Sequence, residues 1–75
     1  MSKIADLTIE FMEIITYDDT SIIIEKLETL FSIMIIYDGY QKVINFIESV
    51  LPIINDEDIK QYVEKELEKY KMCVN

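Results

Sequence analysis

The sequence predicts an all-α protein, a compact bundle of four helices. Apolar residues make up 51% of the 75 residues, and they recur at intervals of three and four, the spacing of one helix face. The chain contains only one Gly and one Pro, and with so many apolar residues its composition is far from that of a disordered chain. We expect one domain over residues 1–75, with helices at about 2–16, 20–37, 40–51 and 56–71.

The first expected helix, residues 2–16, has a wide apolar face. Asp6, Glu10 and Glu13 fall on one narrow polar stripe. The remaining apolar residues are Ile4, Ala5, Leu7, Ile9, Phe11, Met12, Ile14 and Ile15. Because an ordinary surface helix has a narrower apolar stripe, we expect this helix to be contacted from several directions.

The second expected helix, residues 20–37, is the longest apolar-rich stretch and changes character along its length. Glu25, Glu28 and neighbouring polar residues form a stripe that continues as far as Ser32. Beyond that point Ile36 occupies the place of the next polar residue, so the last turns are apolar all round. This end of the helix needs cover on more than one side.

The segment around Asp38-Gly39 allows a second interpretation. An Asp-Gly pair between β-prone residues is typical of a hairpin turn. The residues that follow, however, keep helical spacing: Tyr40, Val43, Ile44, Ile47, Val50, Leu51 and Ile54. The spacing favours a helix, and Gly39 is then expected to end the preceding one.

The last two expected helices have clear boundary signals. Pro52 disfavours helical geometry at Leu51 and is expected to end or kink the 40–51 helix. In that helix, Phe46 lies among polar residues and is expected to be an exposed aromatic side chain. Capping and acidic residues in the segments 18–20 and 55–58 mark the starts of the helices expected at 20–37 and 56–71.

The charge of the chain limits its partners. The net charge is −8, carried without any Arg or His, and residues 1–58 hold twelve acidic residues against three lysines, a net −9. Nucleic-acid binding requires cationic side chains, so we expect no direct contact with nucleic acid. A strongly negative surface attracts basic protein surfaces.

Catalytic and metal chemistry have few candidate residues. Without His, neither a Ser-His nor a Cys-His site can form, and a single Cys provides neither a disulfide nor a zinc site. Gly39 stands alone, so there is no glycine-rich phosphate loop. The sequence therefore predicts a protein that is not an enzyme and has no cofactor or metal.

Membrane association and export are also not expected. Glu25, Lys26 and Glu28 interrupt the longest apolar run, which is too short to span a bilayer. The first residues lack the basic start and apolar core of a signal peptide. We expect an intracellular, cytoplasmic protein.

Two pairs of acidic residues allow a metal-dependent alternative. Glu10-Phe-Met-Glu13 and Glu25-Lys-Leu-Glu28 each place two carboxylates three residues apart on one helix face. This pattern resembles the acidic pairs of the all-α nucleotide pyrophosphohydrolases, although the last acid is Glu where that family has Asp. The resemblance covers residues 10–28 and implies a Mg²⁺ site formed by the two pairs.

Two non-enzymatic functions fit the sequence. The first is a regulatory or inhibitor-type protein-binding module that self-associates as a homodimer, because contiguous apolar surface usually marks an interface. Its candidate apolar interface consists of Ile33, Ile35, Ile36, Tyr37 and Phe46. Alternatively, these residues fill the core of a monomer.

The second is an acidic inhibitor of the phage anti-defence or immunity type. Such a protein mimics nucleic acid and covers the basic surface of a nucleic-acid-handling protein. Its candidate acidic face consists of Asp6, Glu10, Glu13, Asp18, Asp19, Glu25 and Glu28. The same charges also serve solubility in a protein this apolar.

Overall fold

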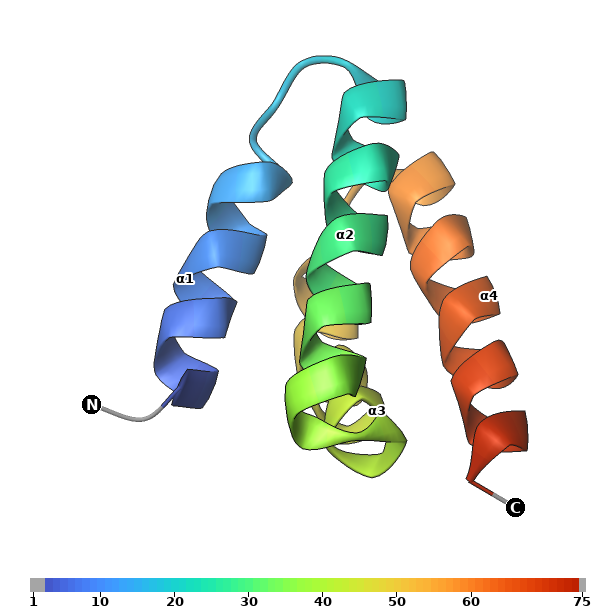
Figure 1. Cartoon of the computed structure of the whole chain (residues 1–75). Coiled ribbons are helices and arrows are strands. Elements are labelled where there is room, and N and C mark those ends of the chain that lie inside the picture. The colour runs from blue at the N-terminus through green and yellow to red at the C-terminus, as the bar shows by residue number, and fades with distance from the viewer. Residues whose placement is uncertain (1–2, 75) are drawn as a thin grey trace.

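The computed structural model confirms the all-α bundle of four helices for residues 3–74, which the structure describes, with side chains from residue 7 onward. The elements are α1 (Lys3–Ile14), α2 (Thr20–Asp38), α3 (Tyr40–Val50), the 3-10 turn η1 (Leu51–Ile53) and α4 (Glu57–Cys73). α1, α2 and α4 lie side by side, and α3 lies behind α2 (Figure 1). α2, α3 and α4 pack against one another, whereas α1 packs mainly on α2. None of the described helices has the length and apolar content needed to cross a membrane.

Local hydrogen bonds set the helix starts as the sequence predicts. The Asp19 carboxylate accepts a hydrogen bond of 2.9 Å from the Ser21 N–H at the start of α2. The Asp56 carboxylate accepts hydrogen bonds from two N–H groups in the first turn of α4, at 2.9 and 3.2 Å. Such caps satisfy N–H groups that have no partner within the helix, and each stabilises it by about 1 kcal/mol.

Gly39 ends α2, as predicted, and its backbone explains why a helix and not a hairpin follows. Its φ of 86° lies in the left-handed region that glycine adopts without steric cost. The Gly39 N–H donates to the Ile35 carbonyl at 3.0 Å, and the Gly39 carbonyl accepts from the Val43 N–H at 3.3 Å. One residue therefore closes α2 and opens α3.

The helix ends differ slightly from the predictions. α1 ends at Ile14, two residues early, because the N–H groups of Thr16 and Tyr17 bond to carbonyls three residues back. The predicted start at residue 2 lies outside the described residues. α3 ends before Pro52 as expected, but Leu51 keeps helical dihedral angles, and the chain continues as the 3-10 turn η1.

All four helices contribute to one hydrophobic cluster. Its buried members are Phe11, Ile14, Ile23, Leu27, Leu30, Phe31, Met34, Val43, Ile44, Phe46, Ile47, Val50, Ile54, Ile59, Val63, Leu67 and Tyr70. Among the residues with described side chains, no polar or charged residue is buried. Hydrophobic burial therefore dominates the stability of this fold.

Two expectations about exposure are wrong. Phe46 is 5% exposed, because α1 covers its side of α3 and the Phe11 ring meets it edge to face at 5.9 Å between centroids. α1 is also not contacted from the several directions that its wide apolar face predicts. Ile9 is 58% and Met12 40% exposed, since only one face of α1 meets the other helices.

Candidate functional site

The most exposed apolar side chains of α2 lie in its last turns. Ile36 is 77%, Tyr37 72% and Ile33 45% exposed. α2 turns its opposite face to the core and is flanked by α1 and α4, so its outward face has no cover from the described residues (Figure 1). We call Ile33, Ile36 and Tyr37 the α2 patch.

The other two predicted interface residues are not part of the α2 patch. Ile35 is half-buried and packs against the core beside α4, in a space that Tyr40 and Tyr70 also line. Phe46 is buried beneath α1, as described above. The structure therefore keeps three of the five predicted residues at the surface.

An open groove of ≈ 420 Å³ runs between α1 and α2. Its lining residues are Leu7, Glu10, Glu13, Ile14, Tyr17, Glu25, Lys26, Thr29, Leu30 and Ile33. A smaller hollow of ≈ 60 Å³ adjoins it, because Leu7 and Ile33 line both spaces and Tyr37 lines the hollow. The α1–α2 groove and the α2 patch thus form one continuous surface.

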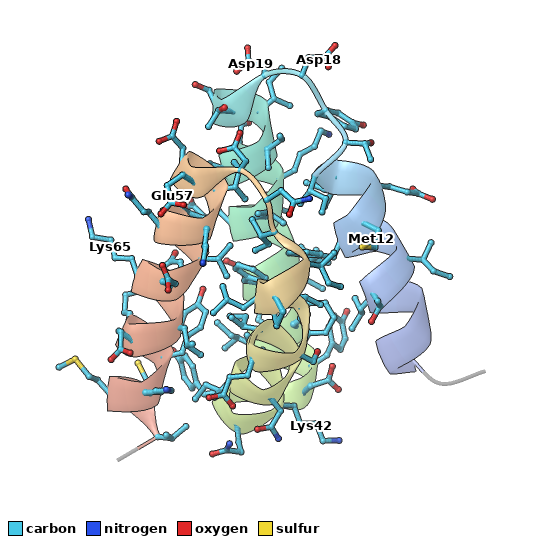
Figure 2. All side chains as sticks on the ribbon, turned by 180° about the vertical axis from the view of Figure 1, so that it is seen from behind. Met12, Asp18, Asp19, Lys42, Glu57 and Lys65 are labelled. Atoms are coloured by element: carbon cyan, nitrogen blue, oxygen red, sulfur yellow. The ribbon has the colours of Figure 1, made fainter. Side chains whose placement is uncertain are left out.

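The predicted acidic face is divided among several places. Glu10, Glu13 and Glu25 line the α1–α2 groove, whereas Glu28 lines the separate space between α2 and α4. Asp18 and Asp19 lie at the connection between α1 and α2 (Figure 2). The Asp19 carboxylate caps α2 there, and the side chain of Asp6 lies outside those described.

The structure does not bring the two acidic pairs together as a metal site. Glu25 and Glu28 face different sides of α2, so Glu28 does not join the pair on α1. Within the described part of the chain, no group of three Asp, Glu or Cys side chains is placed to hold a metal ion. The Mg²⁺ arrangement that the hydrolase resemblance implies is therefore not formed.

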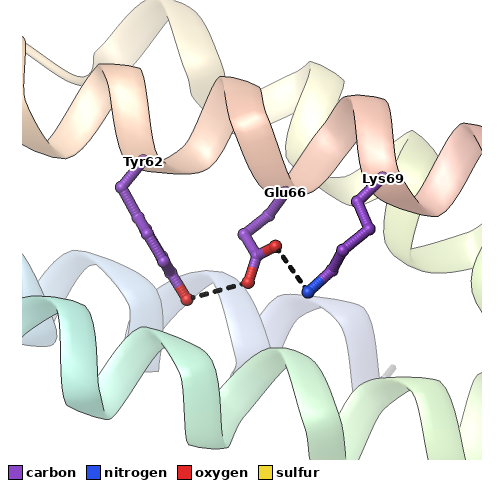
Figure 3. A network of polar contacts seen from close by, with 3 residues as sticks. All are labelled: Tyr62, Glu66 and Lys69. Carbon is purple, nitrogen blue, oxygen red and sulfur yellow. Dashed lines mark hydrogen bonds and ion pairs between the residues drawn. The ribbon is translucent and has the colours of Figure 1, made fainter.

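A polar network on α4 was not identified from the sequence. The Tyr62 hydroxyl donates to Glu66 Oε1 at 3.2 Å, and Lys69 Nζ lies 3.0 Å from Glu66 Oε2 (Figure 3). The Glu66 side chain is only 13% exposed, and its contacts raise the pKa of Lys69. Tyr62, Glu66 and Lys69 stand three and four residues apart, a spacing that indicates contacts on one helix face. The network joins side chains of one helix, and Glu66 and Lys69 also line the open space of ≈ 260 Å³ between α2 and α4.

Comparison of the chain with known protein families, with curated proteins and with solved structures gives no match.

Tyr70 gives the fold a dependence on alkaline pH. Burial, with the nearby Glu66 charge, raises the pKa of Tyr70 from 10.0 to about 12. Between these two pKa values the Tyr70 hydroxyl keeps its proton in the folded chain and releases it in the unfolded chain. The contribution of Tyr70 to the free energy of unfolding is therefore fully present below pH 10 and decreases between pH 10 and 12. In urea unfolding series, we expect this residue to lower the unfolding free energy by up to about 1.4 kcal/mol per pH unit in that window. Tyr70→Phe should make the decline shallower, and an unchanged slope in this variant would contradict the assignment.

Proposed function

We propose that the chain is a non-enzymatic protein-binding module that self-associates as a homodimer through the α2 patch. The observation that carries this proposal is the 77% exposure of Ile36, next to the 72% exposure of Tyr37, on the outward face of α2. These side chains do not lie in the core, so filling a monomer's core does not explain them. Contiguous exposed apolar surface is typical of protein interfaces.

The geometry of α2 suits contact with a second copy. A two-fold axis beside α2 would place the same patch on both chains, so each apolar contact would occur twice. A stable interface covers about 800 Å² per partner, roughly a sixth of the 5035 Å² surface. The α2 patch would supply the apolar centre, and the exposed Thr29 and Ser32 on the same helix would lie at a polar rim.

Isoleucine methyl NMR spectra recorded at increasing protein concentration test this proposal. We expect the methyl signals of Ile33 and Ile36 to shift as the dimer forms. Ile53, 41% exposed on η1, lies beside the α1–α2 connection and the start of α4, and it serves as the internal control. If all three residues kept their shifts at every concentration, the α2 patch would not be a self-association surface.

A second candidate function is that of an acidic inhibitor bound to the basic surface of a nucleic-acid-handling protein. It is favoured by the three carboxylates of Glu10, Glu13 and Glu25, which line one groove. Within residues 7–74, the ion pairs are Lys69 with Glu66 and Lys71 with Glu48, so these three carboxylates have no cationic partner there.

Competition with duplex DNA tests this second candidate. We expect the chain to displace DNA from a basic DNA-binding protein at low salt, and to do so less well as salt rises from about 50 to about 200 mM. A panel of such proteins that all retain their DNA at the lowest salt would rule against it.

A further inference from the structure

We infer that the α1–α2 groove docks a basic amphipathic helix of a partner protein. This inference rests on the proposed protein-binding function and names the chemistry of a partner other than a second copy. Three observations support it. They are the shape of the groove, the charge of the groove, and the fact that none of the described helices of the chain itself presents an exposed basic and apolar face that would fit it.

The shape of the groove fits a helix. Two neighbouring helices form its walls, and four apolar residues lie among its polar lining: Leu7 and Ile33, which are accessible, and Ile14 and Leu30, which are nearly buried. From Glu25 to Tyr37 the surface follows α2 for about 18 Å, which corresponds to about three turns of a bound helix. Helices that dock in this way present apolar residues at helical spacing to the groove. The occupant therefore needs an apolar stripe of about three turns.

The negative charge of the groove determines which residues should lie on either side of the apolar stripe of the bound helix. Glu10 and Glu13 project from α1 and Glu25 from α2, and no described cation pairs with them. The one lysine in the lining, Lys26, has its ammonium 5.2 Å from the centroid of the Tyr17 ring, near the α1–α2 connection. An acidic or neutral helix would leave three carboxylates partly dehydrated without a partner, which is costly. Lys or Arg on both sides of the apolar stripe would pair with them.

Among the helices that the structure describes, none offers such a face to the groove of a second copy. α4 carries four lysines, but its apolar residues Ile59, Val63, Leu67 and Tyr70 are buried in its own core. The outer face of α4 also mixes the lysines with Glu64 and Glu68, and the whole chain has a net charge of −8. Charge complementarity therefore points to a different, basic protein.

A labelled helical peptide tests the inference. The probe is a peptide of about 15 residues with Leu at positions i, i+3, i+4 and i+7 and Lys elsewhere, and its partner peptide has Glu in place of Lys. Fluorescence anisotropy measures affinity, and amide NMR shifts of the unaltered chain locate the peptide. We expect the Lys peptide to bind, with shifts at Leu7, Ile14, Leu30 and Ile33, and the Glu peptide not to bind.

Matched charge reversals separate the groove from the overall charge of the chain. Glu10→Lys with Glu25→Lys alters the groove, and Glu64→Lys with Glu68→Lys makes the same change in net charge on the exposed face of α4. We expect the first pair to weaken peptide binding at least about tenfold and the second pair to have a smaller effect. All four residues are exposed, so both variants should fold, which circular dichroism checks.

Several results would overturn the inference. These are absent peptide binding, equal weakening by both variant pairs, equal binding of the Glu peptide, or amide shifts confined to α4. If the amide signals of Glu10, Glu13 and Ile14, which line the groove outside the α2 patch, shift with chain concentration without peptide, a second copy occupies the groove instead. Self-association and helix docking can be disproved independently of each other. A chain that stays monomeric can still bind the peptide, and a chain that dimerises can still fail to bind it.

Discussion

Replacing Phe46 with alanine is expected to lower the free energy of unfolding by about 3–5 kcal/mol. The side chain is 5% exposed and lies between α3 and α1, where its ring meets Phe11 at an interplanar angle of 85°. Removing the ring leaves a cavity beneath α1 and also removes an edge-to-face contact. Urea unfolding at low protein concentration measures the change.

Ile36→Ala is the control for this loss. Because Ile36 is 77% exposed, its truncation should change the unfolding free energy of the monomer by only about 0.5 kcal/mol or less. Low concentration matters here, since dimerisation would add stability to the folded state. A loss of about 1 kcal/mol or less in Phe46→Ala would mean that α1 does not cover this side of α3.

Ile36→Ser is expected to weaken self-association roughly 100-fold. In a two-fold dimer the substitution acts on both copies, and a loss of about 1.4 kcal/mol per copy corresponds to that factor. Such a loss is modest for an isoleucine side chain that moves from solvent into an interface. Dilution experiments followed by light scattering give the dissociation constant.

Ile53→Ser provides the matched substitution. Ile53 is also exposed, but it lies on η1, in a region lined by the α1–α2 connection and the start of α4. We expect this variant to dimerise like the unaltered chain. Equal weakening by the two substitutions would mean that general hydrophobicity, and not the α2 patch, drives association.

The features that could be predicted from the sequence are those set by residues close together in the chain. Asp19 and Asp56 bond to N–H groups two or three positions ahead, so capping is visible in the local sequence. Gly39 acts through its own φ angle, and Pro52 through its effect on the adjacent turn. These local signals gave the number and approximate bounds of the helices.

Exposure depended on how the helices pack, which local sequence does not specify. Phe46 lies at the edge of the buried face of α3, and only the position of α1 decides that it is covered. The same position leaves Ile9 and Met12 exposed on the far side of α1, although their helix looked apolar on several faces. A helical pattern predicts which residues share a face, but not which neighbour covers it.

The candidate site was predictable in part for the same reason. Ile33, Ile36 and Tyr37 were identified because the polar stripe of α2 ends at Ser32, a purely local pattern. Glu25 and Glu28 were expected to act together, since three residues on a helix differ by about 60° in direction. That difference is enough to place them in separate spaces, because α1 flanks one side of α2 and α4 the other. The α1–α2 groove itself required the structure.

Sedimentation equilibrium of the unaltered chain over a wide concentration range tests the central claim, self-association through the α2 patch, most directly. We predict a mass of twice the 8.9 kDa chain at high micromolar concentration, which decreases toward the single-chain mass on dilution. A mass of 8.9 kDa at every concentration, including the highest, would contradict the claim.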